Sequence, residues 1–366
     1  MPVAKVHRIA AGAPDDVGGI EAAILAGRID AKGVIAVLGK TEGNGLVNDF
    51  SRGLATASLA ALFRRHLPGD AAERICLVMS GGTEGGMAPH WTVFERGAGQ
   101  GDHSVGGPAL AIGRAHTFAL PFEDLGRLGQ VELVAAGVRH AMMDAGIVDP
   151  NDVHFVQIKC PLLTAQRVAE ADGRGVTVAT RDTLKSMGLS RAASALGAAV
   201  ALGEIDAVRI ADADIGGNWQ LWSGRASASA GIELLNHDIV VLGMSAAWSG
   251  PLAVDHAVMR DAIDIEPVRA ALSRLGLPAA GQLSETGRQR LIAVLGKAEA
   301  SHNGSLRGNR HTMLDDSDIS STRHARAFVA GALAGLIGHA EIYVSGGAEH
   351  QGPDGGGPVA LIVNRA

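Results

Sequence analysis

Lysines end three short apolar runs that otherwise resemble one another. Lys40 ends VIAVLGK, Lys159 ends VHFVQIK and Lys297 ends LIAVLGK. A lysine that is removed from water and placed among other cations has a lowered pKa, and its neutral amine is a base. Beside a serine hydroxyl, such an amine takes the proton while the oxygen attacks a carbonyl, as in Ser-Lys hydrolases. The three lysines are therefore candidate bases.

A serine turn of the pattern Ser-[Gly/Ala]-Gly-x-Glu follows each lysine further along the chain. The hydroxyl is a potential nucleophile, and the glycine-rich backbone exposes N–H groups that suit an oxyanion pocket. The residue types do not show which of the three serines is activated, because that depends on packing around each lysine. The turns begin with Ser80-Gly81, Ser229-Ala230 and Ser345-Gly346.

An arginine stands early in an alanine-rich stretch between each lysine and the serine turn that follows it. Arg52, Arg191 and Arg326 hold this position, and Arg323, one helical turn before Arg326, is an alternative in the third copy. Guanidinium groups offer a planar fork of donors to carbonyl or anionic oxygens. The three arginines thus suit a small, flat, polar ligand with carbonyls on several sides.

These residues recur because the chain repeats one α/β unit three times. Each unit is predicted to contain a strand, a helix, the lysine strand, the arginine helix, the serine turn and a final strand. Closure around a pseudo-threefold axis would bring the three lysines, arginines and serines to one centre. Asp15 is the expected N-cap of the first helix. The helices before the lysine strands are expected around residues 16–26, 130–145 and 266–275.

Two segments rich in glycine and small residues, 97–107 and 245–251, are expected to link the copies. They divide the chain into three units of similar size. The expected units are residues 1–104, 112–250 and 256–366.

The composition excludes several classes of protein. The 366 residues include 32 Lys+Arg and 38 Asp+Glu, a net charge of −6, and only 3% are aromatic. A nucleic-acid-binding surface needs a basic stripe and stacking aromatics, so this balance argues against one. The two cysteines form no disulfide framework, no apolar run reaches the roughly 18 residues needed to cross a membrane, and the N-terminal sequence lacks a signal-peptide pattern. We therefore expect a reduced, cytoplasmic protein that acts on a small molecule.

The remaining motifs carry less information. The segment Gly39-Lys40-Thr41 lacks the earlier glycine of a phosphate-binding loop, because Val34 stands there. Cys160 is expected to be inert packing. None of the fourteen histidines shows the helical or cysteine-paired spacing of a zinc site. The glycine-rich and proline-rich segment 347–358, in contrast, presents main-chain carbonyls that suit a hard cation.

Over essentially its full length, the chain resembles the ring-opening amidohydrolases, the family of cyanuric acid amidohydrolases and barbiturases. The resemblance rests on the triplicated lysine, arginine and serine elements and on the C-terminal SGGAEHQGPDGGGP. It implies an α/β fold of three similar units around a pseudo-threefold axis with a central β-barrel-like core, and a homotetramer. It also implies hydrolysis of cyanuric acid to carboxybiuret, which decarboxylates to biuret in s-triazine degradation, without an organic cofactor.

The resemblance also assigns roles to individual residues. It implies one Ser-Lys pair per unit, with Ser229 as the nucleophile and Lys159 as its base. The implied substrate contacts are Arg52, Arg191, Arg326, Ser80, Gly81, Ser229, Ala230, Ser345, Gly346, Lys40 and Lys297. The implied ligands of a structural divalent cation, Mg²⁺ or Ca²⁺, are Glu299, Ala348, Gln351, Gly352, Pro353 and Gly356. Of these, only Glu299 and Gln351 are expected to offer side-chain oxygens.

Three alternative functions stay open at this point. A barbiturase would accept a ring methylene where cyanuric acid has an N–H group, and the sequence does not place the pocket residues that decide between the two rings. A non-catalytic binder of small cyclic imides would use the same cage without opening the ring. A metal-dependent cyclic amidase, as in the dihydroorotase group, needs a histidine cluster that the sequence does not show.

Overall fold

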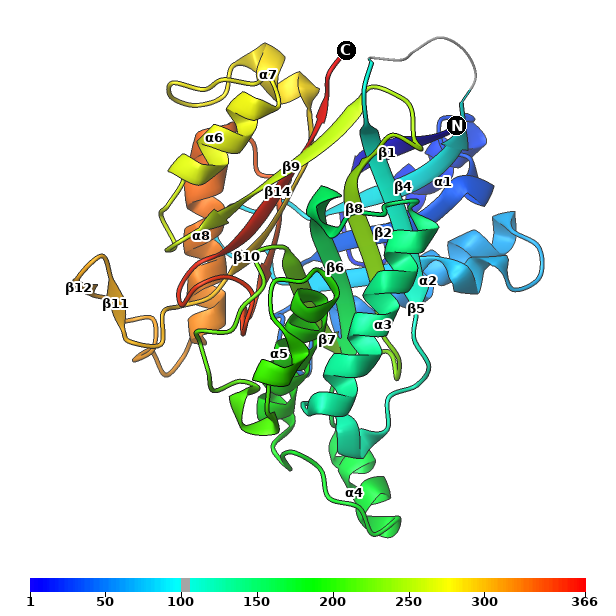
Figure 1. Ribbon diagram of the computed structural model, residues 1–366. Coiled ribbons are helices and arrows are strands. Elements are labelled where there is room, and N and C mark those ends of the chain that lie inside the picture. The colour runs from blue at the N-terminus through cyan, green and yellow to red at the C-terminus, as the bar shows by residue number, and fades with distance from the viewer. Residues whose placement is uncertain (100–105) are drawn as a thin grey trace.

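The computed structural model describes residues 1–99 and 106–366 (Figure 1). Its strands are β1 (Pro2–Ala10), β2 (Val34–Thr41), β3 (Cys76–Gly81), β4 (His90–Ala98), β5 (Ala109–His116), β6 (Val153–Pro161), β7 (Ala226–Gly231), β8 (Asp238–Ser245), β9 (Leu252–Met259), β10 (Leu291–Ala298), β11 (Ser305–Leu306), β12 (Asn309–Arg310), β13 (Tyr343–Gly346) and β14 (Gly357–Asn364). Its α-helices are α1 (Gly18–Leu25), α2 (Phe50–His66), α3 (Leu128–Asp144), α4 (Ala165–Gly173), α5 (Thr183–Ala201), α6 (Glu266–Arg274), α7 (Glu285–Arg290) and α8 (Ser321–Ile337).

Three four-stranded sheets share one topology. The strand orders are β1-β4-β2-β3, β5-β8-β6-β7 and β9-β14-β10-β13, and β11 and β12 form a small separate hairpin. Each large sheet packs against two helices, α1 and α2 for the first, α3 and α5 for the second, and α6 and α8 for the third (Figure 1). The prediction of three similar α/β units is therefore confirmed.

The register of the strands is also repeated. In each sheet the lysine strand runs parallel to the serine strand, and a β-bulge interrupts its antiparallel pairing near its first residues. This register sets every lysine opposite the serine of its own unit. The opposed pairs are Lys40 with Ser80, Lys159 with Ser229 and Lys297 with Ser345.

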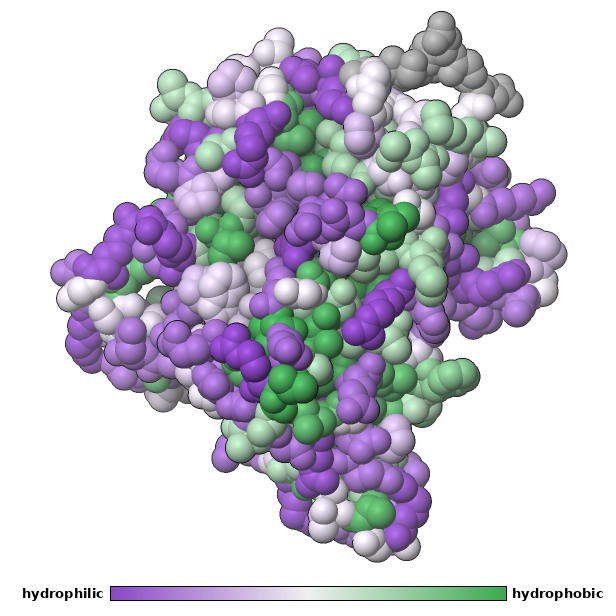
Figure 2. All heavy atoms as spheres, in the orientation of Figure 1, coloured by the Kyte–Doolittle hydropathy of each residue, from purple (hydrophilic) through white to green (hydrophobic). Residues whose placement is uncertain are grey.

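The sheets meet around a shared aliphatic core. Leu38, Ala228 and Leu295, one residue from each sheet, are fully buried in the same apolar cluster. Within residues 1–99 and 106–366 the three sheets stay separate, so their hydrogen bonds do not close a barrel. The centre of the molecule is thus a packed core between three sheets. On the face shown in Figure 2, hydrophilic side chains cover most of the surface.

The expected helices lie within about two residues of the observed α1, α3 and α6. Asp15 is not the N-cap of α1: Val17 holds that position, and Asp16 accepts hydrogen bonds from the backbone of Gly12 and Gly18. The second arginine helix, α5, begins at Thr183, about two turns before Arg191, because Asp182 caps it through the backbone N–H of Lys185. Helix α4 was not predicted.

The expected unit boundaries remain a prediction. Strands β5 and β9 begin at Ala109 and Leu252, so the expected unit starts at residues 112 and 256 lie inside strands. Residues 100–105 of the first expected linker lie outside the described part of the chain. In the second linker Trp248 is buried and donates a hydrogen bond to the backbone oxygen of Ala145. Among the described helices, none has the length and hydropathy needed to cross a membrane.

Candidate active site

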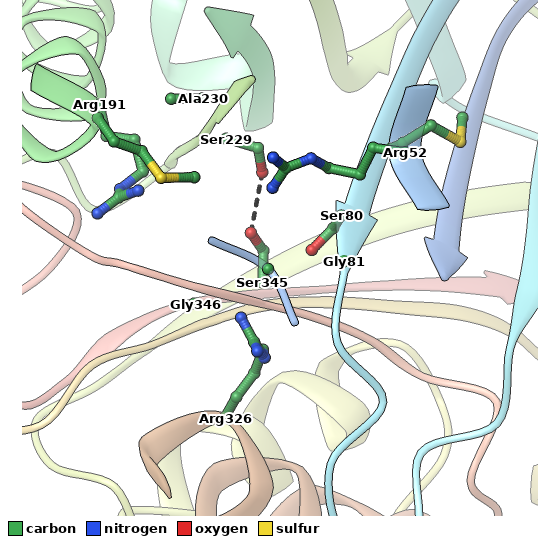
Figure 3. A pocket seen from close by; sticks show the side chains of 12 residues that line it. Arg52, Ser80, Gly81, Arg191, Ser229, Ala230, Arg326, Ser345 and Gly346 are labelled. Carbon is green, nitrogen blue, oxygen red and sulfur yellow. Dashed lines mark hydrogen bonds between the residues drawn. The ribbon is translucent and has the colours of Figure 1, made fainter. Parts of the chain in front are cut away.

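One small pocket collects the predicted arginines and serine turns of all three units. Figure 3 shows the arginines entering from different sides, with the three serines near the centre. The pocket encloses about 230 Å³, including its opening to solvent. Its lining residues are Gly45, Arg52, Met79, Ser80, Gly81, Met187, Arg191, Ser229, Ala230, Arg326, Ser345 and Gly346.

Each pocket arginine is paired with the glutamate that ends the serine turn of another unit. The pairs run in one direction around the axis, from the third unit to the first, from the first to the second and from the second to the third. A carboxylate that accepts hydrogen bonds from a guanidinium fixes the plane of the guanidinium and leaves its other N–H groups free to bind a ligand. The pairs are Arg326 with Glu84 (2.5 and 2.7 Å), Arg52 with Glu233 (3.8 Å) and Arg191 with Glu349 (2.6 and 2.8 Å).

The third unit offered two candidate arginines, and the structure separates them. Arg326 is buried and lines the pocket. Arg323 is half-buried and donates to Glu84 at 3.0 Å from outside the pocket lining. Arg323 therefore supports the Glu84 carboxylate that holds Arg326.

The three serines lie close to the centre of the pocket. The hydroxyls of Ser229 and Ser345 are hydrogen-bonded at 2.9 Å (Figure 3). Ser229 is the most exposed of the three, at 7% against 4% for Ser80 and 2% for Ser345. The turn of the first unit requires glycine, since a Cβ at Gly81 would lie 1.6 Å from a carboxylate oxygen of Asp49.

The three lysines are buried behind the serines and do not line the pocket. Lys40 Nζ donates to Ser80 Oγ at 3.3 Å, and Lys297 Nζ donates to Ser345 Oγ at 3.2 Å. Burial is the main reason why the pKa of each lysine is lowered. The pKa of Lys40 falls well below its ordinary value and that of Lys297 falls to about 7. Both shifts favour the neutral amine beside Ser80 and Ser345.

Lys159 differs from the other two lysines in having a carboxylate partner. Its Nζ donates to the backbone oxygen of Met79 at 2.7 Å, as Lys297 Nζ donates to that of Ala228 at 2.9 Å, but it also forms an ion pair with Glu233 at 2.8 Å. Burial lowers the pKa of Lys159, while the neighbouring Glu233 carboxylate opposes this change. Among the described side chains, Ser229 and Lys159 share no hydrogen bond, although they are opposed in the sheet. Ser229 is instead connected to Lys297 through Ser345.

The residues expected to hold a cation lie around a tightly wound loop. Glu299 is buried, and burial together with the nearby Glu349 carboxylate raises the pKa of Glu299. A buried carboxylate of this kind fits a cation as its counter-charge. The side-chain oxygen of Gln351 accepts a hydrogen bond from the backbone of Ala228 at 2.6 Å, so its main-chain carbonyl is the group left for a cation. Gly352 has a left-handed backbone conformation, which glycine adopts at low cost and which allows the loop to turn tightly.

Sequence reasoning missed two groups of residues at the site, the glutamates that hold the arginines and three residues that line the pocket. The glutamates at the fifth position of each serine turn had a usable signal, because they recur in all three copies. Gly45, Met79 and Met187 had none, since they occur at positions without a repeated residue type.

Comparison with known proteins identifies the family of this chain. A family model described as amidohydrolase ring-opening protein matches residues 5–364. A cyanuric acid amidohydrolase from Azorhizobium caulinodans is 66% identical over 365 residues, covering 100% of this chain and 99% of the relative, and one from a Bradyrhizobium species is 60% identical over 364 residues, covering 99% and 98%. A crystal structure of the cyanuric acid hydrolase from A. caulinodans covers 100% of both chains with a TM-score of 0.94 and 65% identity. A second solved cyanuric acid hydrolase, described as an evolutionary innovation by structural concatenation, covers 100% of both chains with a TM-score of 0.95 and 47% identity. The chain belongs to the family of ring-opening amidohydrolases.

Proposed function

We propose that this protein is a cyanuric acid amidohydrolase, which hydrolyses a C–N bond of the cyanuric acid ring. The observation that carries the proposal is the convergence of three arginines and three serine turns on one pocket of about 230 Å³. Cyanuric acid has three carbonyls around a flat ring, so each unit can address one of them. The names of the similar proteins point to the same substrate.

The pocket holds its donors in place before a substrate arrives. The glutamate partners orient Arg191 and Arg326 through two hydrogen bonds each. Fixed donors of this kind stabilise charge that develops on a carbonyl oxygen without reorganising during the reaction. The arginines and the turn N–H groups therefore bind the ring oxygens and stabilise the oxyanion.

For the chemical steps, we propose Ser229 as the nucleophile and Lys159 as its base. The neutral amine of Lys159 takes the hydroxyl proton, the Ser229 oxygen bonds to a ring carbonyl carbon, and the C–N bond breaks as Lys159 returns the proton to nitrogen. Water then releases the acyl group as carboxybiuret, which loses carbon dioxide to give biuret. The register opposes Ser229 to Lys159, as it opposes the other two pairs, and the greater exposure of Ser229 supports the choice of this serine. Lys159 must turn from Met79 towards Ser229 for the transfer.

Alanine variants of the three serines and three lysines test this assignment. We expect Ser229→Ala and Lys159→Ala to abolish ring opening, measured as loss of cyanuric acid, and the other four variants mainly to raise KM. A lysine that acts as base through Ser345 would give the opposite result: Lys297→Ala and Ser345→Ala would then abolish turnover while Lys159→Ala kept it. Preferential turnover of barbituric acid would refute the choice of substrate. Binding of cyanuric acid without turnover by the wild-type protein would favour the non-catalytic binder.

We further propose that a structural Mg²⁺ or Ca²⁺ is held beside the pocket by Glu299 and by the main-chain carbonyls of the C-terminal loop. The candidate carbonyl ligands are Ala348, Gln351, Gly352, Pro353 and Gly356. The ion would fix the loop that follows the third serine turn. We therefore expect chelation to lower the melting temperature clearly, while kcat of the protein that stays folded changes little. A cytoplasmic homotetramer that acts in s-triazine degradation remains part of the proposal.

A further inference from the structure

Neighbouring units meet at three joints, where the first strand of one unit lies beside the lysine strand of another. At two of the three joints an arginine of the first strand donates a hydrogen bond to a backbone oxygen of the lysine strand. Between the third and first units, Arg8 on β1 donates to the backbone oxygen of Ile292 on β10 at 3.3 Å. Between the first and second units, Arg114 on β5 donates to the backbone oxygen of Ile35 on β2 at 3.4 Å. Both isoleucines lie five residues before the lysine that ends their strand. The two joints are therefore equivalent.

The joint between the second and third units departs from this rule. The strand registers place His256 on β9 where the other units have arginine, and His154 on β6 where they have isoleucine. The two Nδ1 atoms lie 2.9 Å apart. A carboxylate oxygen of Asp255, the residue before His256, lies 3.4 Å from Nδ1 of His154. An arginine-to-carbonyl bond has thus been replaced by two imidazoles and a carboxylate.

We propose that His154, Asp255 and His256 form a binding site for a divalent transition metal ion such as Zn²⁺. Their three ligand atoms all lie within 4.8 Å of one another. Zinc binds nitrogen and oxygen at about 2.0–2.2 Å, so ligand atoms of a tetrahedral site lie about 3.3 Å apart. The observed separations of 2.9 and 3.4 Å fall on either side of this value. Two imidazoles and one carboxylate suit Zn²⁺ or Co²⁺, whereas Mg²⁺ prefers oxygen ligands.

The carboxylate is already oriented by groups behind it. Oδ2 of Asp255 accepts from Arg274 at 2.6 Å, and Oδ1 accepts from the backbone N–H of His256 at 2.7 Å. Outer contacts of this type fix the direction of metal ligands. Asp255 and Arg274 also line an open surface cavity, so the carboxylate side of the cluster borders a cavity.

The charges around the site allow a cation to bind. Arg274 is paired with Asp255, and the nearby Arg225 is paired with Glu204 at 2.9 Å. The short Nδ1–Nδ1 contact leaves room for a single proton between the rings. A bound ion takes the place of that proton and links the second unit to the third.

A second cluster of three possible metal ligands, with a cysteine in place of one histidine, serves as a control. Cys76, His116 and Asp238 also lie within 4.8 Å of one another, at the joint between the first and second units. Nε2 of His116 is already hydrogen-bonded to a group outside the cluster, the backbone oxygen of Arg74 at 3.1 Å, while Nδ1 faces Asp238 of the cluster at 2.8 Å. Cys76 is fully buried. We therefore expect this cluster not to take up the ion.

The test uses full-length protein that has been treated with chelator and then supplied with saturating Mg²⁺, which fills the proposed C-terminal loop site. This protein is titrated with Zn²⁺ and, in a parallel experiment, with Co²⁺ as a spectroscopic probe. We expect one Zn²⁺ per chain by calorimetry, a raised melting temperature and a tetrahedral Co²⁺ spectrum without a thiolate charge-transfer band. The double variant His154→Ile/His256→Arg installs the residue pair of the other two joints. It should keep ring opening and lose at least about 100-fold in Zn²⁺ affinity, a larger loss than the 10–100-fold typical when only an outer-shell partner is removed. The matched control His116→Gln should bind as the wild type does.

Three results would overturn the proposal: no Zn²⁺ uptake by the wild type, undiminished uptake by the double variant, or a thiolate band that points to Cys76. Should the double variant fail to fold, His154→Gln carries the same comparison, because His154 is partly exposed and its amide leaves the joint filled. Ring opening serves here only as a sign of correct folding, so the result is independent of the mechanism proposed above.

Discussion

The ion pair between Lys159 and Glu233 gives a prediction with a definite sign. Among the carboxylates of residues 1–99 and 106–366, only that of Glu233 lies within 4 Å of one of the three site lysines. A carboxylate stabilises the protonated amine and so raises the pKa of Lys159, against the effect of burial. The change Glu233→Gln keeps the size and a hydrogen-bond acceptor but removes the charge. It should therefore lower the pKa of Lys159.

The size of the effect follows from the distance. Two unit charges 2.8 Å apart interact by about 6 kcal/mol at an effective dielectric constant of about 20. The glutamine dipole replaces part of this attraction, and a charged neighbour commonly shifts a pKa by about 1–3 units. If Lys159 is the base, the acid limb of kcat/KM reports its pKa in the free enzyme. We expect this limb to move to lower pH by about 1–3 units.

The assay is the pH dependence of kcat/KM for loss of cyanuric acid, measured in buffers of constant ionic strength. Glu84→Gln is the matched control, because Glu84 occupies the same position in the first turn but holds Arg326 instead of a lysine. That control should raise KM and leave the limb where it is. An unmoved limb in Glu233→Gln, or equal shifts in both variants, would show that Lys159 is not the group that titrates.

Three further changes test other parts of the structure. Arg191→Lys removes the bidentate contact with Glu349 at 2.6 and 2.8 Å. A hydrogen bond to a charged group contributes about 1.5–3 kcal/mol, so kcat/KM should fall about 10–150-fold. A change below threefold would contradict the role of the pair. Gly81→Ala places a Cβ 1.6 Å from Asp49 and should reduce the free energy of unfolding by about 1–3 kcal/mol, whereas Ala230→Gly, which makes the second turn like the others, should reduce it by less; equal losses in denaturant melts would refute the steric argument. Burial lowers the pKa of His237 from 6.5 to about 3, so its contribution to stability is complete above pH 6.5 and is lost as the pH falls towards 3, by up to about 1.4 kcal/mol per pH unit. His237→Gln should flatten this part of the stability curve, and an unchanged slope would show that another group is responsible.

Repetition is what made the fold and most of the pocket predictable. A lysine at one strand end says little, but Lys40, Lys159 and Lys297 recur in the same order with an arginine and a serine turn. Residues that recur at equivalent places in a closed, symmetric fold come together at its axis. The same reasoning, had it been applied to the glutamates of the serine turns, would have placed them beside the pocket too.

Contacts between units could not be predicted in the same way. Glu84 and Arg326 are 242 residues apart in the chain, and His154 and His256 are 102 apart. No local pattern reports such pairs, because they depend on how the units pack against one another. The direction of a lysine side chain has the same origin: Lys159 lies opposite Ser229 in the sheet, yet its amine reaches Met79 and Glu233 through the packing of two units.

A pocket with three equivalent Ser-Lys pairs would give a symmetric ring three equal chances to react. The structure removes this equality in the second unit, where Ala230 replaces a glycine and Lys159 has a carboxylate partner at 2.8 Å. The same unit supplies Ser229, the most exposed of the three hydroxyls. In the proposed mechanism the threefold arrangement binds the three carbonyls with similar donors, and one Ser-Lys pair carries out the chemical step. The departures from symmetry are therefore better guides to the reactive serine than the repeated residues themselves.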